Sequence, residues 1–128
     1  MMRAKIHRAT ITQCDPDYAG SITIDAELLR ASGICPNEAV QVYDIDNAAR
    51  FETYVIYGDP GSSVIAINGA AAKLVSVGDK IIIVSFGYLD EADVSEHEGV
   101  VIVADEHNRV GQTLRYPSIV EQPVTASR

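Results

Sequence analysis

The chain contains little cysteine. Cys14 and Cys35 are the only two in 128 residues, which is too few for a disulfide scaffold, and their spacing does not suit a zinc knuckle. No other stretch has the residue spacing that is typical of a metal site. We therefore expect two reduced thiols and no bound metal.

Basic residues and long apolar runs are also scarce. The 10 Lys and Arg residues are outnumbered by 18 Asp and Glu, which gives a net charge of −8 and a pI near 4.7. Because a nucleic-acid-binding face needs clustered basic residues, no nucleic-acid partner is expected. No apolar run approaches the ~18 residues that span a bilayer. The polar and basic residues after Met1 lack the apolar core of a signal peptide, so we expect a cytoplasmic protein without a membrane partner.

The sequence shows no internal repeat, low-complexity segment or linker between domains. A length of 128 residues is typical of one domain, so residues 1–128 are expected to form a single unit. Valine and isoleucine are abundant whereas leucine is scarce, and this composition favours strands over helices. The sequence therefore predicts a mainly-β protein.

Alternating apolar and polar residues predict a series of short strands. They are expected at 6–12, 21–24, 39–45, 50–57, 63–67, 80–86 and 99–105, the last as an edge strand. Asp25 can cap a short helix over 26–31 that ends at Gly33, and a second short helix is expected over 70–75. Short, closely spaced strands with two short helices indicate a small closed or nearly closed barrel.

The residues from Leu89 onward differ in character. Those at 90–93 and 96–98 are mainly acidic and are expected to be exposed. The final residues, which include Pro117 and Pro123, predict an extended or poorly ordered tail. We therefore treat 89–128 as a divergent, partly flexible C-terminal segment.

The most informative feature that the sequence does contain is the pair Gly20-Ser21 in YAGSITID (18–25). It occurs together with KIHRAT (5–10), RFETY (50–54) and NGAAA (68–72). A Gly-Ser pair before a strand is by itself only a turn. The four segments in this order resemble the aspartate 1-decarboxylase family, whose members cut their own backbone at such a bond. The resemblance covers about residues 3–86 and implies a six-stranded double-psi β-barrel.

The resemblance also implies an activity. Cleavage would leave a β chain, residues 1–20, and an α chain, residues 21–128, in which Ser21 has become a covalent pyruvoyl cofactor. The matured enzyme would decarboxylate L-aspartate to β-alanine and CO2 through a Schiff base, for pantothenate and coenzyme A biosynthesis. The family further implies a homotetramer with sites at subunit interfaces.

The chemistry of the Gly20-Ser21 bond explains how such cleavage would begin. The Ser21 hydroxyl can attack the Gly20 carbonyl carbon through a five-membered ring, which converts the amide into an ester. This step loses amide resonance. A strained backbone, which glycine permits, would promote it, and a donor near the carbonyl would stabilise the developing oxyanion.

Three candidate residues share the strand expected at 50–57. Arg50 can bind a substrate carboxylate bidentately, while the resemblance assigns Thr53 to processing and substrate binding and Tyr54 to proton donation. Strand alternation places Arg50 and Tyr54 on one face and Thr53 on the other. A β-bulge, or a site shared between two subunits, would reconcile these faces.

The NGAAA segment is typical of a turn that opens a helix, where backbone N–H groups can bind an anion. The resemblance assigns Gly69, Ala70 and Ala71 to substrate binding, with Asn68 orienting the region.

Three more residues are supporting candidates. Lys5 and His7 lie two apart on one face of the first strand. Lys5 can pair with a substrate carboxylate or with the new Gly20 terminus, and His7 can donate or accept a hydrogen bond in the site. Tyr18 is similar to the tyrosine that precedes the cleavage site in the family.

Two alternative functions stay open at this point. One is the same chemistry on another amino acid such as glutamate, since one extra methylene changes a pocket without changing a motif. The other is a non-catalytic barrel that acts as a binding module. The presence of Gly20-Ser21, Thr53 and Tyr54 weighs against the second alternative.

Overall fold

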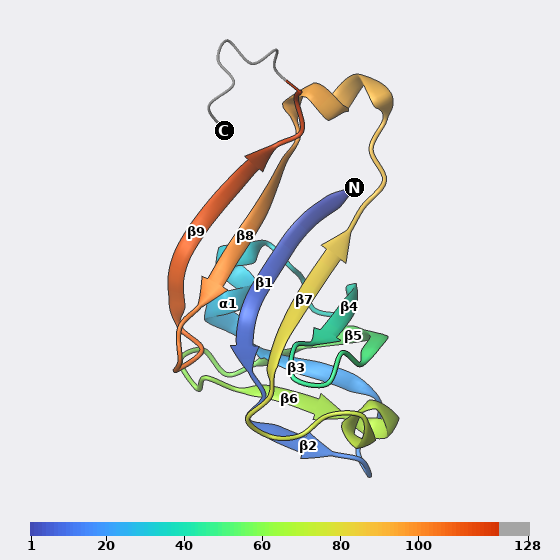
Figure 1. Cartoon of the computed structure of the whole chain (residues 1–128), viewed down its shortest axis with the longest axis vertical. Helices are drawn as coiled ribbons and strands as arrows, with labels where there is room; N and C mark the ends of the chain where they lie inside the picture. The colour runs from blue at the N-terminus through green and yellow to red at the C-terminus, as the bar shows by residue number, and fades with distance from the viewer. Residues whose placement is uncertain (121–128) are drawn as a thin grey trace.

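The computed structural model describes residues 1–120 and consists mainly of strands, which confirms the mainly-β class (Figure 1). The nine strands are β1 (Met2–Thr10), β2 (Gln13–Asp15), β3 (Ser21–Asp25), β4 (Ala39–Asp44), β5 (Arg50–Gly58), β6 (Ile65–Asn68), β7 (Lys80–Phe86), β8 (Glu98–Ala104) and β9 (Val110–Pro117). One helix, α1 (Ala26–Ser32), and two 3₁₀ helices, η1 (Gly69–Lys73) and η2 (Glu91–Glu96), connect them.

The strands form one sheet in the order β2-β6-β3-β5-β4-β7-β1-β8-β9. β1 and β2 are separated by only two residues, yet β2 pairs with β6 at the far end of this order. Thr12, between them, donates its N–H to the Ile65 carbonyl at 2.8 Å, and its side-chain oxygen accepts the Ile65 N–H at 2.9 Å. In the sheet, the run β6-β3-β5-β4-β7 lies between β2 and β1. The bent β1–β2 segment therefore pairs with both ends of this run, β2 with β6 and β1 with β7. This order is consistent with the expected six-stranded barrel, while the double-psi topology stays a prediction.

The barrel interior is filled by branched aliphatic side chains. Ile6, Ile22, Ile67 and Ile83, from four different strands, are fully buried. Their strand neighbours on the opposite face, such as Lys5 and Thr23, are only half-buried. This alternation places the side chains of Lys5 and Thr23 on the outer face of the sheet.

Helix α1 begins and ends close to the predicted residues. The buried Asp25 carboxylate accepts the Glu27 N–H at 2.8 Å, and Gly33 ends the helix with a left-handed φ of 79°. These are local signals that sequence carries directly. The second helix is a single 3₁₀ segment that ends at Lys73 and does not reach Val75.

The strand predicted at 99–105 is confirmed as β8, but the prediction that it lies at an edge was wrong. β8 lies between β1, to which it is parallel, and β9, to which it is antiparallel. The residues of β9 are almost all exposed. Its sequence therefore lacks the apolar alternation that would predict a strand. Pro117 ends that strand, whereas Pro123 lies outside the described residues. The acidic stretch at 90–93 is exposed as expected and leads into η2.

Across residues 1–120, the structure contains no helix with the length and apolarity required to cross a membrane.

Candidate active site

Ser21 is the first residue of β3 and is almost fully buried, with 1% of its surface exposed. It pairs with Asn68, the last residue of the antiparallel strand β6. The Asn68 side-chain amide donates a hydrogen bond to the Ser21 hydroxyl oxygen at 2.9 Å. The hydroxyl itself faces the Ala19 carbonyl at 3.5 Å. A candidate nucleophile is thus held by a side-chain donor beside the Gly20-Ser21 bond.

Asn68 also stands at the N-terminus of η1, but its side chain does not cap that helix. The amide nitrogen instead contacts Ser21 and, at 3.1 Å, the Thr23 hydroxyl. A capping side chain would have occupied the N–H groups that open η1. Because the Asn68 side chain points toward Ser21, it does not cap the N–H groups that open η1. These groups lie next to the candidate cleavage site.

Gly69 brings the start of η1 into close contact with the chain before Ser21. Its φ is +79°, and a Cβ placed on it would lie 2.6 Å from the Gly20 Cα and 2.8 Å from the Gly20 nitrogen. A side chain at this position would therefore force the Gly20 backbone to move. At Gly20 itself φ lies outside the left-handed region, and a Cβ would meet nothing within 4 Å. The sequence suggested that the backbone requires glycine at position 20. In the structure, the position that requires glycine is 69.

Tyr54 and Thr53 lie near the same bond. β3 runs parallel to β5 with Ile22 opposite Val55. Continuing this register by one residue puts Tyr54 next to Ser21, and by two residues puts Thr53 level with Gly20. Adjacent strands are ~4.8 Å apart, so the backbones of both residues lie close to the Gly20-Ser21 bond.

The faces of β5 agree with the alternation expected from sequence. Arg50 and Tyr54 are exposed, whereas Thr53 is half-buried on the same side as the core residue Val55. The pairing of β5 with β4 and β3 contains no register shift, so the β-bulge that was considered is not present. Arg50 lies four residues from Tyr54, about 13 Å along a strand.

Arg50 instead belongs to a second region of the outer face. Its guanidinium lies 4.3 Å from the centre of the Tyr43 ring on β4, a cation–π contact. In the sheet register, Arg50 is opposite Tyr43, Tyr43 is opposite Ile82, and Ile82 is opposite His7. Lys5 lies in the next row on the same face. We call Lys5, His7, Tyr43 and Arg50 the Arg50 group.

His7 in this group is poorly solvated. Its Nδ1 atom is buried without a hydrogen-bond partner in the described part of the chain. Burial, followed by the nearby charges of Lys5 and Arg8, lowers the pKa of His7 below its ordinary value. The neutral imidazole is therefore the favoured form at neutral pH.

The remaining candidates lie close in the chain to Gly20 or to Gly69. The Tyr18 carbonyl lies 3.2 Å from the position of a Cβ on Gly69, while the Tyr18 ring is about half exposed. Ala70 is exposed and Ala71 is half-buried against the core. We call Gly20, Ser21, Thr53, Tyr54 and Asn68–Ala71 the Ser21 group.

The sequence did not predict Tyr43 as a residue of these regions. Tyr43 contacts Arg50, and the signal that could have found it is an aromatic residue on the outward positions of a strand next to the strand of Arg50. The two groups together contain every predicted site residue except Tyr18, but within one chain they lie apart.

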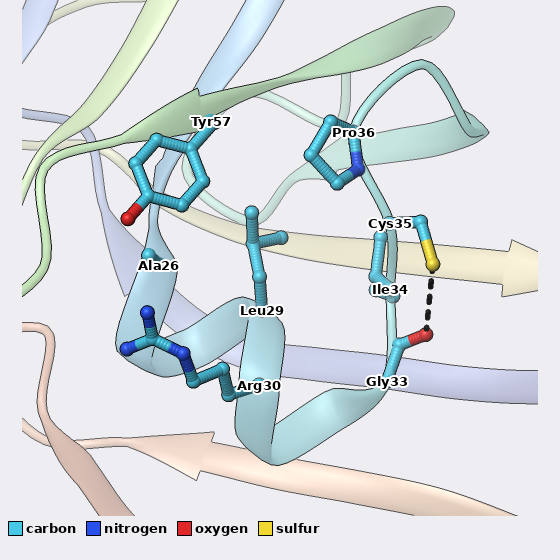
Figure 2. Close-up of a pocket in the computed structure, with 8 residues that line it drawn as sticks. All are labelled: Ala26, Leu29, Arg30, Gly33, Ile34, Cys35, Pro36 and Tyr57. Carbon is cyan, nitrogen blue, oxygen red and sulfur yellow. Dashed lines mark hydrogen bonds between the residues drawn. The ribbon is translucent and has the colours of Figure 1, made fainter.

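The pocket shown in Figure 2 is a different feature. It has a volume of about 280 Å³ and lies between α1, the residues after it and Tyr57 of β5. Leu29, Ile34 and Pro36 make it largely apolar, and none of the predicted site residues lines it. It is therefore not the candidate active site.

Comparison with known proteins identifies the family. Residues 1–111 match the family model described as aspartate decarboxylase. The chain is 52% identical over 110 residues to a protein from Carboxydothermus hydrogenoformans named aspartate 1-decarboxylase, covering 86% of this chain and 87% of that protein. Two proteins of the same name are each 48% identical: one from Geobacillus sp. (strain WCH70), with 96% of this chain and 93% of the relative covered, and one from Clostridium novyi, with 91% and 94% covered. The chain therefore belongs to the aspartate decarboxylase family.

Proposed function

We propose that this chain cleaves itself between Gly20 and Ser21 and then decarboxylates L-aspartate to β-alanine and CO2. The observation that carries the proposal is the buried Ser21 hydroxyl, held at 2.9 Å by the Asn68 amide next to that bond. Membership of the family, whose curated members bear the name aspartate 1-decarboxylase, supports the substrate.

Cleavage follows from the chemistry of Ser21. Its oxygen attacks the Gly20 carbonyl carbon, the C–N bond breaks, and the amide becomes an ester with a free amine on residue 21. Loss of the residue-21 α-proton then expels the Gly20 carboxylate and leaves dehydroalanine. Its imine tautomer takes up water and releases ammonia, which gives a pyruvoyl group. Asn68 is the donor best placed to orient the Ser21 oxygen for the first step.

The residues around position 21 fit such a group. Gly69 and Ala70 present no bulk beside it, and the Asn68 amide can donate to an oxygen at that position. A pyruvoyl carbonyl supplies an electron sink for the electrons that remain when CO2 leaves. Tyr54, beside residue 21 in the strand register, is the proposed proton donor for the product carbon.

The Arg50 group would bind the substrate carboxylate. The Arg50 guanidinium can bind a carboxylate bidentately, but Arg50 lies about 13 Å from Tyr54 along β5. Each group has an exposed member on β5: Arg50 in one, and Tyr54, which is 41% exposed, in the other. We infer that the Arg50 group of one chain completes the Ser21 group of another, as in a homotetramer with sites at subunit interfaces.

This activity would provide β-alanine for pantothenate and coenzyme A biosynthesis in the cytoplasm. The working protein would then contain a β chain of residues 1–20 and an α chain of residues 21–128. Strands β8 and β9 would remain part of the same single domain, since β8 pairs directly with β1.

Mass spectrometry of the denatured protein tests the proposal. Wild-type protein is expected to separate into a 1–20 fragment and a 21–128 fragment whose N-terminus is blocked to sequencing. Ser21→Ala should stay intact and inactive, because the attacking hydroxyl is gone. Ser95→Ala, the same change at an exposed serine of η2, should cleave normally. An intact, inactive wild-type chain would support the non-catalytic barrel instead, and faster turnover of glutamate than of aspartate would change the substrate but not the chemistry.

A further inference from the structure

Three carboxylates outside the candidate active site converge where two turns meet. Asp44 is the last residue of β4, Asp46 belongs to the turn between β4 and β5, and Asp79 precedes β7. One oxygen from each residue lies within 4.8 Å of the corresponding oxygens of the other two. We call these three residues the carboxylate cluster.

Backbone N–H groups hold each carboxylate of the cluster in place. One Asp44 oxygen accepts the N–H groups of Asp46 at 2.8 Å and Asn47 at 3.1 Å. Asp46 accepts the Lys80 N–H at 2.8 Å, and Asp79 accepts the Ser76 N–H at 3.0 Å. The carboxylates are therefore fixed by the fold, and each keeps an oxygen that these bonds do not use.

The second oxygen of Asp44 is the unusual atom. Asp44 is 2% exposed, and its Oδ2 is buried without a hydrogen-bond partner in the described structure. No salt bridge within residues 1–120 involves any member of the cluster. A buried carboxylate oxygen without a donor or a counter-charge is strongly unfavourable.

The Asp44 carboxyl group is also in contact with that of Asp79. Two carboxyl groups in contact need either a proton or a cation between them.

We propose that the carboxylate cluster binds a divalent cation of the calcium class. Calcium takes oxygen ligands at about 2.3–2.6 Å, so oxygens on opposite sides of the ion lie about 5 Å apart, which suits the spacing of the cluster. Asp46 is exposed, which gives the ion access and leaves room for water ligands. The ion would join the β4–β5 turn, which leads into Arg50, to the loop that precedes β7.

Calorimetric titration of the metal-free protein with CaCl2 near neutral pH tests this site. We expect one Ca²⁺ per chain with a dissociation constant of roughly 10⁻⁴ to 10⁻³ M. The unfolding midpoint should rise by roughly 5 to 10 °C in about 10 mM Ca²⁺. NaCl at the same ionic strength should not reproduce this rise.

Two amide variants and a charge-matched control locate the ion. Asp44→Asn and Asp79→Asn can each keep the backbone hydrogen bond on one side-chain oxygen, and both should lose at least tenfold in calcium affinity and most of the shift in midpoint. Asp93→Asn removes one negative charge from the exposed η2 and should bind calcium as the wild type does. Absence of calcium binding by the wild type would overturn the proposal in favour of a shared proton. Unchanged binding by both cluster variants would place the ion elsewhere and overturn it too.

Discussion

Two glycines lie in contact at the candidate cleavage site and have different physical roles. Gly69 occupies a left-handed conformation with no space for a Cβ, whereas Gly20 has space for one. We predict that Gly69→Ala loses roughly 1–3 kcal/mol of unfolding free energy from backbone strain alone, and that displacement of Gly20 slows cleavage. Urea unfolding and the rate of fragment formation are the measurements.

Gly20→Ala is the matched control for that variant. It should retain nearly wild-type stability, because a methyl group there meets nothing within 4 Å. Equal loss of stability in the two variants would contradict the assignment of the steric requirement to Gly69.

Tyr54 can be examined separately from cleavage. Tyr54→Phe removes the phenolic proton and keeps the ring, so the variant should mature, bind aspartate and release CO2. Release of β-alanine should then fall ~10²–10⁴-fold, the usual contribution of a general acid. Single-turnover measurements of both products on fully cleaved protein test this expectation.

Tyr57→Phe makes the same change on the same strand, at a residue that lines the pocket in Figure 2. It should leave both products unchanged. Normal β-alanine release by Tyr54→Phe would remove Tyr54 from the acid role, and failure to cleave would assign it to maturation.

Sequence patterns predicted the identities of the Ser21 group but not its internal contacts. The Gly20-Ser21 pair stands out because of the motif around it. The bond from Asn68 to Ser21 depends on the antiparallel register of β3 and β6, which lie 47 residues apart in the chain. Alternation within one strand does not specify such a register.

At the scale of elements, Glu38 joins β1 to β7 through side chains. It accepts hydrogen bonds from Arg3 and Ser85, and its other oxygen accepts the Cys35 N–H at 3.2 Å. Desolvation alone would raise the pKa of Glu38, but the hydrogen bonds from Ser85, Arg3 and Cys35 prevail and lower it from the ordinary value of 4.5. The folded state therefore favours the ionised carboxylate.

This linkage predicts a loss of stability in acid. Because the folded pKa of Glu38 is lowered, its contribution is fully present above pH 4.5 and is lost as the pH falls through the folded pKa. The difference in unfolding free energy between wild type and Glu38→Gln should therefore shrink below that pH. Urea unfolding at several pH values measures it. Glu52→Gln, on the outer face of β5, is the control, and a difference independent of pH would contradict the role of Glu38.

Elements with local signals were predicted more accurately than elements that depend on pairing. Helix α1 has its cap at Asp25 and its end at Gly33, so the predicted helix is only one residue shorter than the observed one. β9 depends on its pairing with β8 along most of its length. Its exposed residues carry no apolar period, so the sequence predicted only an extended tail there.

At the scale of the whole molecule, we propose that the chain presents two incomplete halves of a site. Tyr54 of the Ser21 group and Arg50 of the Arg50 group are both exposed, and β5 runs from one to the other. The sequence indicated this conflict through the opposite faces of Thr53 and Tyr54. It could not distinguish a β-bulge from a site shared between subunits, because the absence of a bulge in β5 is a property of the paired sheet.

A mixed assembly tests whether two chains share one site. Arg50→Ala lacks the proposed carboxylate anchor and Ser21→Ala cannot mature, so each variant alone should be inactive. When the two are co-expressed, an Arg50→Ala chain supplies the matured residue 21 and a Ser21→Ala chain supplies Arg50. Random assembly would then make about a quarter of the sites complete, and aspartate turnover should recover to about that level. If each chain built its site alone, every site in the mixture would lack one group and the mixture would stay inactive. Sedimentation of a fully active wild-type monomer would lead to the same conclusion.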